Sequence, residues 1–177
     1  MAYQILVPNS EIDKNDIYGT YTAIDDVETH DRGATAISCM LVDPNEGDIE
    51  VGFSNPVAAG TITSVELHVV GHISDLGVDY GYITPYLHIG SNYYGIGGWG
   101  YYLFESTSWT EFSKTWLTNP AGGAWAWTDL TDLSLLMEMC IDPDYVHDDV
   151  ECTSAYLKVN YILPAAGGAQ IIGLDVW

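Results

Sequence analysis

Aromatic residues concentrate in one glycine-rich stretch of the chain, SNYYGIGGWGYY, which covers residues 91–102. Tyrosine and tryptophan rings have flat apolar faces and a polar atom at the edge, so they can stack on sugar rings or fill a protein interface. The flanking glycines predict a loop or a hairpin tip that exposes the rings. Two functions are therefore open, glycan binding and packing on a neighbouring subunit, and we favour the second. The candidate residues are Tyr93, Tyr94, Trp99 and Tyr101.

Acidic side chains are dense in a second stretch, DPDYVHDDVE, which covers residues 142–151. Calcium ions take about six to eight oxygen ligands, and acidic loops can supply them. Neither this stretch nor the acidic segment DPNEGDIE, residues 43–50, has the ligand spacing of an EF-hand loop. A solvated turn is the interpretation that we favour, with calcium as the one cofactor considered. The candidate calcium ligands are Asp142, Asp144, Asp148, Asp149 and Glu151.

Three histidines fall on alternating segments that have the pattern of strands. His68 and His72 share one face of residues 61–73, but four strand residues span about 13 Å, which is too far for one metal ion. His88 could pair with one of them from a neighbouring strand. The sequence has no G-x-S-x-G, H-E-x-x-H or phosphate-loop motif, and no helical pattern follows GIGGWG. We therefore predict that the protein is not an enzyme.

The charge of the chain argues against two classes of partner. There are 25 acidic and 4 basic residues, and the formal net charge is −21. Binding to nucleic acid or to an anionic membrane surface needs clustered lysine and arginine. No segment approaches the roughly 20 apolar residues of a transmembrane helix. We therefore expect a solvated acidic surface, with no nucleic acid and no membrane among the partners.

The three cysteines leave the redox state of the chain open. Cys140 and Cys152 flank the acidic stretch, and they would face each other at its base if it is a hairpin loop. A disulfide needs Cβ atoms about 3.8 Å apart, so the pair is either a disulfide or two free thiols. Cys39 lies in an apolar strand pattern, which predicts a buried thiol.

Strand patterns dominate the rest of the chain. Apolar and polar residues alternate with period two over residues 61–73, 82–90 and 152–163. Within the second of these, Pro85 indicates an edge strand or a bulge. The predicted inward residues are Val65, Leu67, Val69, Ile73, Ile83, Leu87, Ile89, Ala155, Leu157, Val159 and Tyr161. Shorter strands are predicted over residues 35–42, 48–54, 101–106, 109–118 and 136–141.

One segment has a helical pattern. In TDLTDLSLL, residues 128–136, Thr128 is a natural N-cap, and Asp129 stands in the first turn, where the helix dipole favours an acid. Short strands separated by turns, with one short helix, predict an all-β fold, an antiparallel β-sandwich, for residues 1–163. Residues 164–177 then form a C-terminal arm that begins with a linker of flexible composition.

The stretch TWLTNPAGGAWAWTDLTDLSLL, residues 115–136, resembles a pattern in jelly-roll-like β-sandwich domains of phage and virus structural proteins. In that pattern a strand ends in W-x-T-N-P, a turn of small residues follows, and an aromatic residue before threonine opens a short helix. The similarity extends in order of elements from residue 10 to residue 162. It implies a jelly-roll-like fold and a role in particle structure, and it carries no catalytic motif. The matching residues are Trp116, Thr118, Asn119, Pro120, Trp127, Thr128 and Leu130.

The same stretch also has a purely structural interpretation. A residue before proline is restricted to extended conformations, which applies to Asn119, and the glycines that follow favour a turn. Trp116 and Trp127 bracket this turn, and each could bury about 200 Å². We therefore expect these tryptophans to clamp the short helix onto the edge of the sandwich.

The sequence thus predicts a virion structural protein first: a capsid, capsid-decoration or tail-associated subunit that binds copies of itself and other virion proteins. The N-terminal residues lack a signal-peptide pattern, and the acidic, lysine-poor composition is that of an external protein, so we expect a virion or extracellular location. The alternatives are a carbohydrate-binding or adhesin module and a non-viral extracellular filament or surface-layer subunit. The arm is the expected inter-subunit contact, through Ile171, Ile172, Leu174, Val176 and Trp177.

Overall fold

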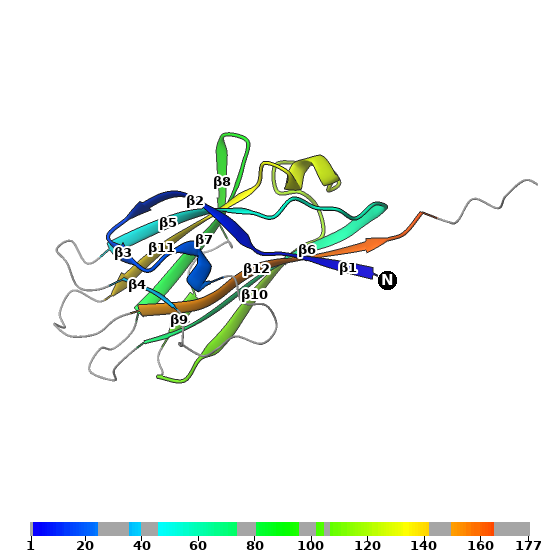
Figure 1. Cartoon of the computed structure of the whole chain (residues 1–177). Coiled ribbons are helices and arrows are strands. Elements are labelled where there is room, and N and C mark those ends of the chain that lie inside the picture. Colours follow the sequence, from blue (N-terminus) through cyan, green and yellow to red (C-terminus); the bar gives the residue numbers. More distant parts are fainter. Residues whose placement is uncertain are drawn as a thin grey trace, which may run out of the picture.

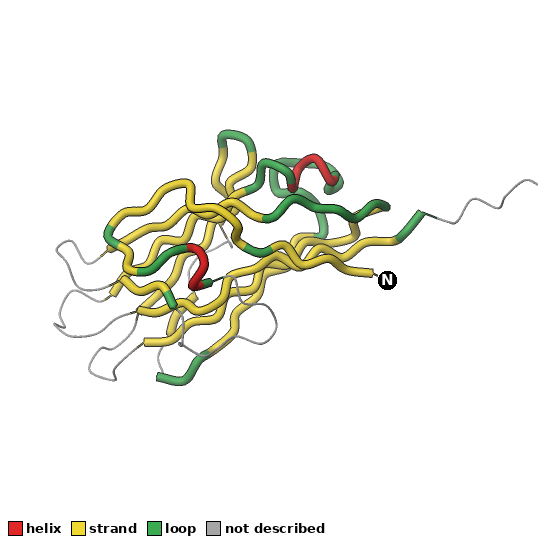
Figure 2. The backbone as a smooth tube through the Cα atoms, in the orientation of Figure 1, coloured by secondary structure: helices red, strands yellow, loops and turns green. Residues whose placement is uncertain are grey.

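The computed structural model describes residues 2–24, 36–39, 46–73, 81–95, 102–104, 107–141 and 150–164. Over these residues the strands form two antiparallel sheets that pack face to face (Figure 1). Figure 2 shows how little of the described chain is helical: two short 3-10 helices, η1 (Tyr21–Ala23) and η2 (Trp127–Leu130). The predicted all-β antiparallel sandwich is confirmed.

One sheet, called sheet A below, is built around its two longest strands. Its order is β10-β6-β12-β4-β3, and β1 also pairs with β12. Because β6 and β12 pair along almost their whole length, they form the rigid centre of this sheet. The strands of sheet A are β1 (Ala2–Leu6), β3 (Ile17–Tyr18), β4 (Ile37–Cys39), β6 (Thr61–Ile73), β10 (Thr110–Trp116) and β12 (Val150–Ile162).

The opposing sheet, called sheet B, has the order β2-β5-β11-β7-β8, and β9 also pairs with β7. β7 and β8 form a hairpin in which Ile89 pairs with Asn92, so only Gly90 and Ser91 make the turn. Gly90 has φ 65°, a conformation that such tight hairpin turns require and that glycine adopts readily. The strands of sheet B are β2 (Pro8–Asn15), β5 (Glu46–Phe53), β7 (Gly81–Ile89), β8 (Asn92–Gly95), β9 (Tyr102–Phe104) and β11 (Ser134–Ile141).

The two longest strands follow the predicted alternation, with two irregularities in their pairing, one after Cys152 and one after Asn160 of β12. In β6, Val65, Leu67 and Val69 are fully buried. In β12 the register shifts by one residue between Cys152 and Ser154, which is a β-bulge. The bulge changes which residue numbers face inward, so that Cys152 before it and Ala155 after it are both fully buried.

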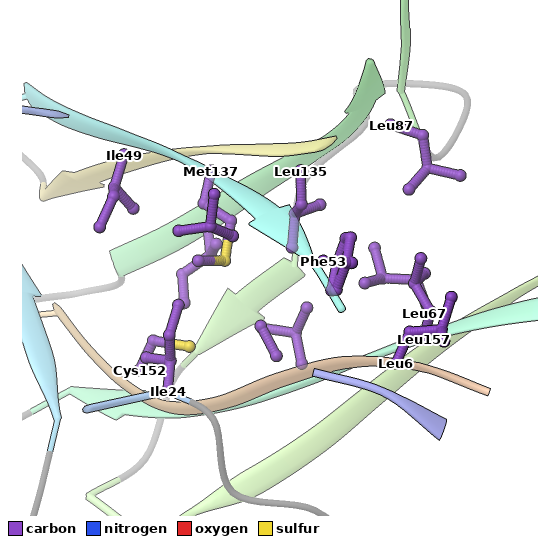
Figure 3. Packing of buried hydrophobic residues seen from close by; sticks show 14 of the residues in the cluster. Leu6, Ile24, Ile49, Phe53, Leu67, Leu87, Leu135, Met137, Cys152 and Leu157 are labelled. Carbon is purple, nitrogen blue, oxygen red and sulfur yellow. The ribbon is translucent and has the colours of Figure 1, made fainter. Parts of the chain in front are cut away.

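The hydrophobic core fills the space between the two sheets (Figure 3). Ile49, Leu135 and Met137 reach it from sheet B, and Leu67 and Leu157 face them from sheet A. Two residues predicted to point inward, Ile89 and Tyr161, are only partly buried because they lie near strand ends. Burial of this apolar surface is the main force that holds the two sheets together.

The tryptophan-rich stretch fastens the crossing from β10 to β11 onto the sandwich. Trp125 is 6% exposed, and its Nε1 donates a hydrogen bond of 3.2 Å to the carbonyl of Trp116. Trp127 Nε1 donates to the carbonyl of Gly60 at 2.8 Å, and its ring meets Tyr161 edge to face. The predicted anchoring by Trp127 is therefore present, and Trp116 contributes its carbonyl and a partly buried ring. Trp125, which the prediction did not include, is the most buried of the three.

The helix in this stretch is shorter than predicted and starts earlier. It is a single 3-10 turn, Trp127–Leu130, capped at Ala126 rather than at Thr128. The carboxylate of Asp129 accepts a hydrogen bond of 2.8 Å from the backbone N–H of Ala126, which satisfies a donor at the helix start. β11 then begins at Ser134, and alternate side chains of this extended strand fill the core between the sheets.

The hairpin that would bring Cys140 and Cys152 together is not present. Cys140 belongs to β11 in sheet B, whereas Cys152 belongs to β12 in sheet A, so the chain crosses between the sheets here. Cys152 is a free, buried thiol, and its Sγ lies 3.5 Å from the carbonyl of Ser154. Burial raises the pKa of Cys152 to about 12. The prediction of a buried thiol at Cys39 concerns a side chain outside the described set.

Pro85 is not on an edge strand. Its strand, β7, pairs with β11 on one side and with β8 and β9 on the other. Among the described residues, the β9 pairing ends at Ile83 and the β8 pairing starts at Tyr86, so on that side Pro85 lies between the two described partners. A proline is tolerated in this interior strand because its missing N–H can face the interval between these partners.

Candidate functional site

The outer face of sheet B carries four side chains that meet although they come from four different strands. Pairing places Ser134 of β11 opposite His88 of β7, and His88 opposite Tyr93 of β8. Glu50 reaches the group from β5, on the other side of β11. Alternate residues of these strands point into the core, so these four point outward. We call Glu50, His88, Tyr93 and Ser134 the Glu50 cluster.

The carboxylate of Glu50 holds the cluster together. Ser134 Oγ donates a hydrogen bond of 2.6 Å to Oε1, and His88 Nδ1 lies 2.7 Å from the same oxygen. The hydroxyl of Tyr93 donates to Oε2 over a longer 3.5 Å. Glu50 is 8% exposed, so a nearly enclosed carboxylate links side chains of three other strands.

Tyr93 is the most exposed member of the cluster. Its ring stacks on the ring of His88, with 4.2 Å between centroids and 18° between planes. The residue is nevertheless 50% exposed. The contacts with His88 and Glu50 fix the orientation of the ring, and its exposed part remains available to a ligand.

A second tyrosine lies beside this cluster. Tyr86 pairs with Gly95 of β8, and a Cβ atom at Gly95 would lie 3.3 Å from the Tyr86 ring. The glycine therefore leaves room for the ring to pack against β8. The hydroxyl of Tyr86 is hydrogen-bonded to Glu138, an exposed residue of β11. The outer face of sheet B thus presents two tyrosines, each beside a glutamate.

The protonation states of these groups follow from their surroundings. Burial acts to raise the pKa of Glu50, but hydrogen bonds from Ser134 and His88 and the charge of His88 lower the pKa below its ordinary value. Desolvation and the neighbouring Glu50 raise the pKa of Tyr93, while desolvation and Glu138 raise that of Tyr86. At neutral pH, therefore, Glu50 is an acceptor and the phenols keep their protons.

Serine, histidine and glutamate together invite comparison with a nucleophilic triad, but the geometry differs. In a triad the serine and the acid contact opposite nitrogens of the histidine, so that the histidine can take the serine proton. Here Ser134 and Glu50 both approach Nδ1 of His88, and the Ser134 hydroxyl donates its hydrogen bond to Glu50 instead. This arrangement positions side chains and does not activate the serine.

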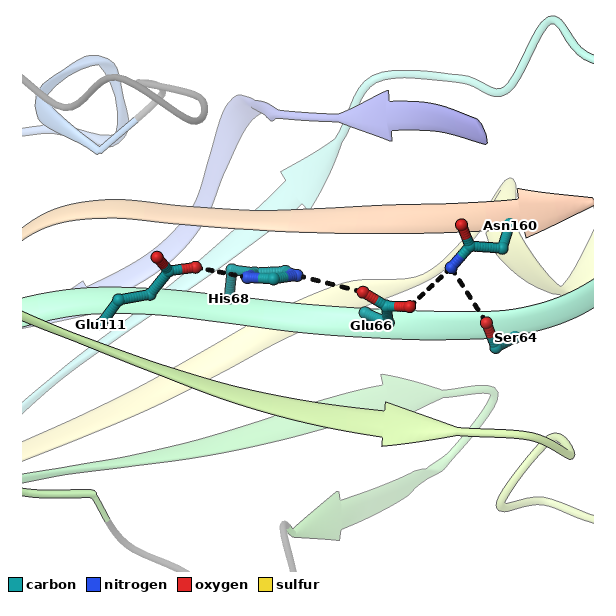
Figure 4. A network of polar contacts seen from close by, with 5 residues as sticks. All are labelled: Ser64, Glu66, His68, Glu111 and Asn160. Carbon is teal, nitrogen blue, oxygen red and sulfur yellow. Dashed lines mark hydrogen bonds and ion pairs between the residues drawn. The ribbon is translucent and has the colours of Figure 1, made fainter. Parts of the chain in front are cut away.

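The outer face of sheet A carries a separate polar network (Figure 4). His68 Nδ1 lies 2.5 Å from Glu111 of β10, and its Nε2 lies 3.4 Å from Glu66 of β6. Asn160 of β12 donates from Nδ2 to Glu66 at 2.6 Å and to Ser64 at 3.0 Å. The network ties three neighbouring strands together across the sheet surface.

Each described histidine is paired with a glutamate. Besides His68 and His88, His72 Nε2 lies 2.7 Å from Glu151 of β12. His88 stands on sheet B and the other two on sheet A, so the suggestion that His88 joins one of them in a metal site is wrong. Within the described ranges, no three histidine, cysteine or acidic side chains converge as metal ligands.

The residues predicted as site candidates are only partly brought together. Tyr93 points outward beside His88, whereas Tyr94 pairs with Leu87 and so lies on the opposite face of β8. Glu151 lies in β12 and pairs with His72. The others lie outside the described residues: Trp99, Tyr101, Asp142, Asp144, Asp148, Asp149, Ile171, Ile172, Leu174, Val176 and Trp177.

Sequence reasoning missed Glu50, Ser134 and Tyr86. The alternating patterns place Glu50 and Tyr86 on outward positions of predicted strands, so part of the signal was present. The helical pattern includes Ser134, so the strand predicted over residues 136–141 starts two residues too late to contain it. Strand order is not part of the local pattern, so nothing in the sequence indicates that Glu50 and His88 meet across β11.

No protein-family model matches the chain, and no curated protein matches it. Among solved structures, the chain is similar to the CBM22-1 xylan-binding domain of Xyn10C from Paenibacillus barcinonensis, with 9% identity, 88% of this chain and 98% of that chain covered, and a TM-score of 0.46. The C-terminal CBM6 of LamC, a marine laminarinase from Zobellia galactanivorans, gives 12% identity, 90% and 100% coverage and a TM-score of 0.40.

A third similar structure is a Stig cyclase, Fisc from Fischerella sp., in complex with an indole compound. It has 10% identity, covers 90% of this chain and 85% of that chain, and gives a TM-score of 0.46. At such scores these similarities carry no argument about function, and the fold assignment rests on the two sheets themselves. In the part of the chain that the structure describes, no helix is long and apolar enough to cross a membrane.

Proposed function

We propose that the protein is a non-catalytic carbohydrate-binding module whose site is the outer face of sheet B around Tyr93. The observation that carries the proposal is the ring of Tyr93, which is 50% exposed yet fixed by His88 and Glu50. A ring that is already ordered loses little conformational entropy when a ligand packs on it. The apolar face of a sugar ring is a suitable partner for such a surface.

Polar groups beside the two tyrosines can form hydrogen bonds with the hydroxyl groups of a sugar. Sugar hydroxyls both donate and accept hydrogen bonds, and binding sites combine apolar surfaces with a few fixed polar groups. Exposed Glu138 offers a carboxylate acceptor beside Tyr86, and Asp13 of β2 adds a second near Tyr93. The protonated phenols of Tyr86 and Tyr93 add polar atoms at the ring edges. These groups come from regular strands, so their positions are set by the sheet.

The virion subunit that the sequence favours remains a prediction. Its expected contact, the arm at residues 171–177, lies outside the described residues, as do Trp99 and Tyr101. The described part of the chain offers the Tyr93 surface instead, and this surface favours the carbohydrate-binding alternative. A glycan-binding module can also be part of a particle or a surface layer, so the two functions are compatible.

The test is a binding screen with matched variants. The purified protein is applied to an array of neutral, acidic and basic glycans, and each hit is measured by titration calorimetry. Tyr93→Ala is expected to weaken binding about 10- to 100-fold, since a central aromatic contact carries much of the binding energy. The control is Tyr3→Ala, because Tyr3 is 52% exposed but belongs to sheet A. Absence of any hit, or equal effects of both variants, would refute the proposal.

A further inference from the structure

Carboxylates are concentrated on the outer face of sheet B around the proposed site. Strand pairing places Asp13 of β2 opposite Glu50. Two residues away on β5, Asp48 pairs with Asn15 of β2 on one side and with Glu138 of β11 on the other. Asp13 is close enough to act electrostatically on Tyr93. Carboxylates therefore border both tyrosines of this face.

Positive side chains are absent from the same face over the described residues. Lys14 pairs with Ile49, which faces the core, so the Lys14 side chain does not lie on the outer face. Its Nζ donates a hydrogen bond of 3.0 Å to the carbonyl of Gly19. Lys114 and Lys158 belong to sheet A, where they lie over the rings of Trp116 and Tyr3. His88 is the one basic group near Tyr93, and its Nδ1 is committed to Glu50.

We infer that the glycan bound at Tyr93 and Tyr86 is a basic one, a chain of amino sugars with free amino groups, and this inference rests on the proposed function. An ammonium group gains from a neighbouring carboxylate and from the face of an aromatic ring, and this site offers both. A neutral sugar gains only the packing and the hydrogen bonds. A uronic acid or a sulfated sugar is repelled, because the face holds no lysine or arginine among the described residues to pair with it.

The position of Glu138 makes it the residue that distinguishes ligands by their charge. It is exposed, and its carboxylate is held beside the Tyr86 ring by the hydroxyl of that tyrosine. Glu50 is enclosed by Ser134 and His88 and is better suited to hold Tyr93 in place. Neutralising Glu138 should therefore change the charge preference and leave the aromatic surface intact.

The experiment uses oligosaccharides of equal length with the same β-1,4-linked backbone: glucosamine, N-acetylglucosamine, glucose and, as the acidic case, glucuronic acid. Titrations are carried out at low salt in a mildly acidic buffer, in which amines and side-chain carboxylates are both charged. The glucosamine oligomer should bind about tenfold more tightly than the neutral ones. This advantage should vanish at about 0.5 M salt, which screens exposed charges.

Two variants separate the possible results. Glu138→Gln should reduce the preference for the amino sugar several-fold, because it weakens binding of the amino sugar more than binding of neutral sugars, whose hydroxyls can still donate to the glutamine carbonyl. Glu111→Gln, on the outer face of sheet A, should change neither affinity. Neutral oligomers that bind as tightly as the amino sugar, or a preference that survives in Glu138→Gln, would overturn this inference and leave the proposed function standing. Failure of all the oligomers and all array glycans to bind would overturn both.

Discussion

Glu50 and His88 meet across an intervening strand. Their side chains approach to 2.7 Å between Oε1 and Nδ1, although β11 lies between β5 and β7 in the sheet. The residue beneath the contact is Ser134, which is small enough to let two longer side chains meet above it and donates its own hydrogen bond to Glu50. The orientation of Tyr93 depends on this contact, because Tyr93 stacks on His88.

The size of Ser134 gives the first prediction. Ser134→Leu should place a bulky side chain where Glu50 and His88 meet, separate them, and lower the free energy of unfolding by about 1–3 kcal/mol. Ser134→Ala keeps the space and removes one hydrogen bond, so it should cost only about 1 kcal/mol. Urea unfolding followed by tryptophan fluorescence measures both. Equal stability of the two variants would show that the contact does not depend on a small residue.

The lowered pKa of Glu50 gives a pH dependence. A carboxyl whose pKa is lower in the folded than in the unfolded state stabilises the fold above the unfolded value, near 4.5, and this contribution is lost as the pH falls through the folded value. Glu50→Gln should lower the free energy of unfolding by about 1–3 kcal/mol at neutral pH. The gap between wild type and variant should narrow below pH 4.5.

The control for this prediction is the exposed carboxylate of Glu138. Glu138→Gln should change the free energy of unfolding by about 0.5 kcal/mol or less at every pH, since surface substitutions usually have small effects. Chemical unfolding of the wild type and both variants, measured across the acidic range, gives the comparison. A gap for Glu50→Gln that stays constant down to strongly acidic pH would contradict the assignment of Glu50 as an ionised, hydrogen-bonded group.

The sandwich itself could be predicted from the sequence because period-two alternation is a local signal. The segment predicted over residues 61–73 is β6 to the residue, and Val65, Leu67 and Val69 are buried as expected. The β-bulge after Cys152 could not be predicted from the sequence, because it arises from the pairing of β12 with β6. Along β12 itself it only shifts the phase of the apolar–polar alternation.

The site was harder to predict because it depends on strand order. Tyr93 was recognised from its glycine-rich surroundings, but Glu50 and Ser134 come from segments far from it in the sequence. The leucines after Leu130 fit helical spacing, yet the residues from Ser134 onward form a strand whose alternate side chains fill the core. Tertiary packing overrode the local pattern at the point where the site is assembled.

The tryptophan clamp can be tested by truncation. Trp125→Ala should lower the free energy of unfolding by about 3–5 kcal/mol, because it empties a buried position and removes the hydrogen bond to Trp116. Leu117→Ala is the control, since Leu117 lies nearby in sequence but is 75% exposed. Thermal and urea unfolding should separate the two clearly. Similar losses for both would mean that the stretch does not anchor the crossing between the sheets.

The buried thiol of Cys152 predicts a kinetic result. With a pKa of about 12, the thiolate fraction at pH 8 is about one in ten thousand, so Cys152 should resist alkylation in the folded protein. Peptide mass mapping after iodoacetamide treatment, with and without denaturant, measures this site separately from the other cysteines. Rapid labelling of native Cys152, or a disulfide from Cys152 to Cys140 in unreduced protein, would contradict its burial as a free thiol.

The central claim is that a glycan binds on the outer face of sheet B, and backbone NMR tests it most directly. At 19.4 kDa the chain is suited to two-dimensional amide spectra. The best-binding glycan is titrated into labelled protein, and the residues whose amide signals shift are placed on the two sheets. We predict shifts centred on Tyr93, Tyr86 and His88. Shifts centred on sheet A, around His68 and Glu111, or no shifts with any glycan, would contradict the account.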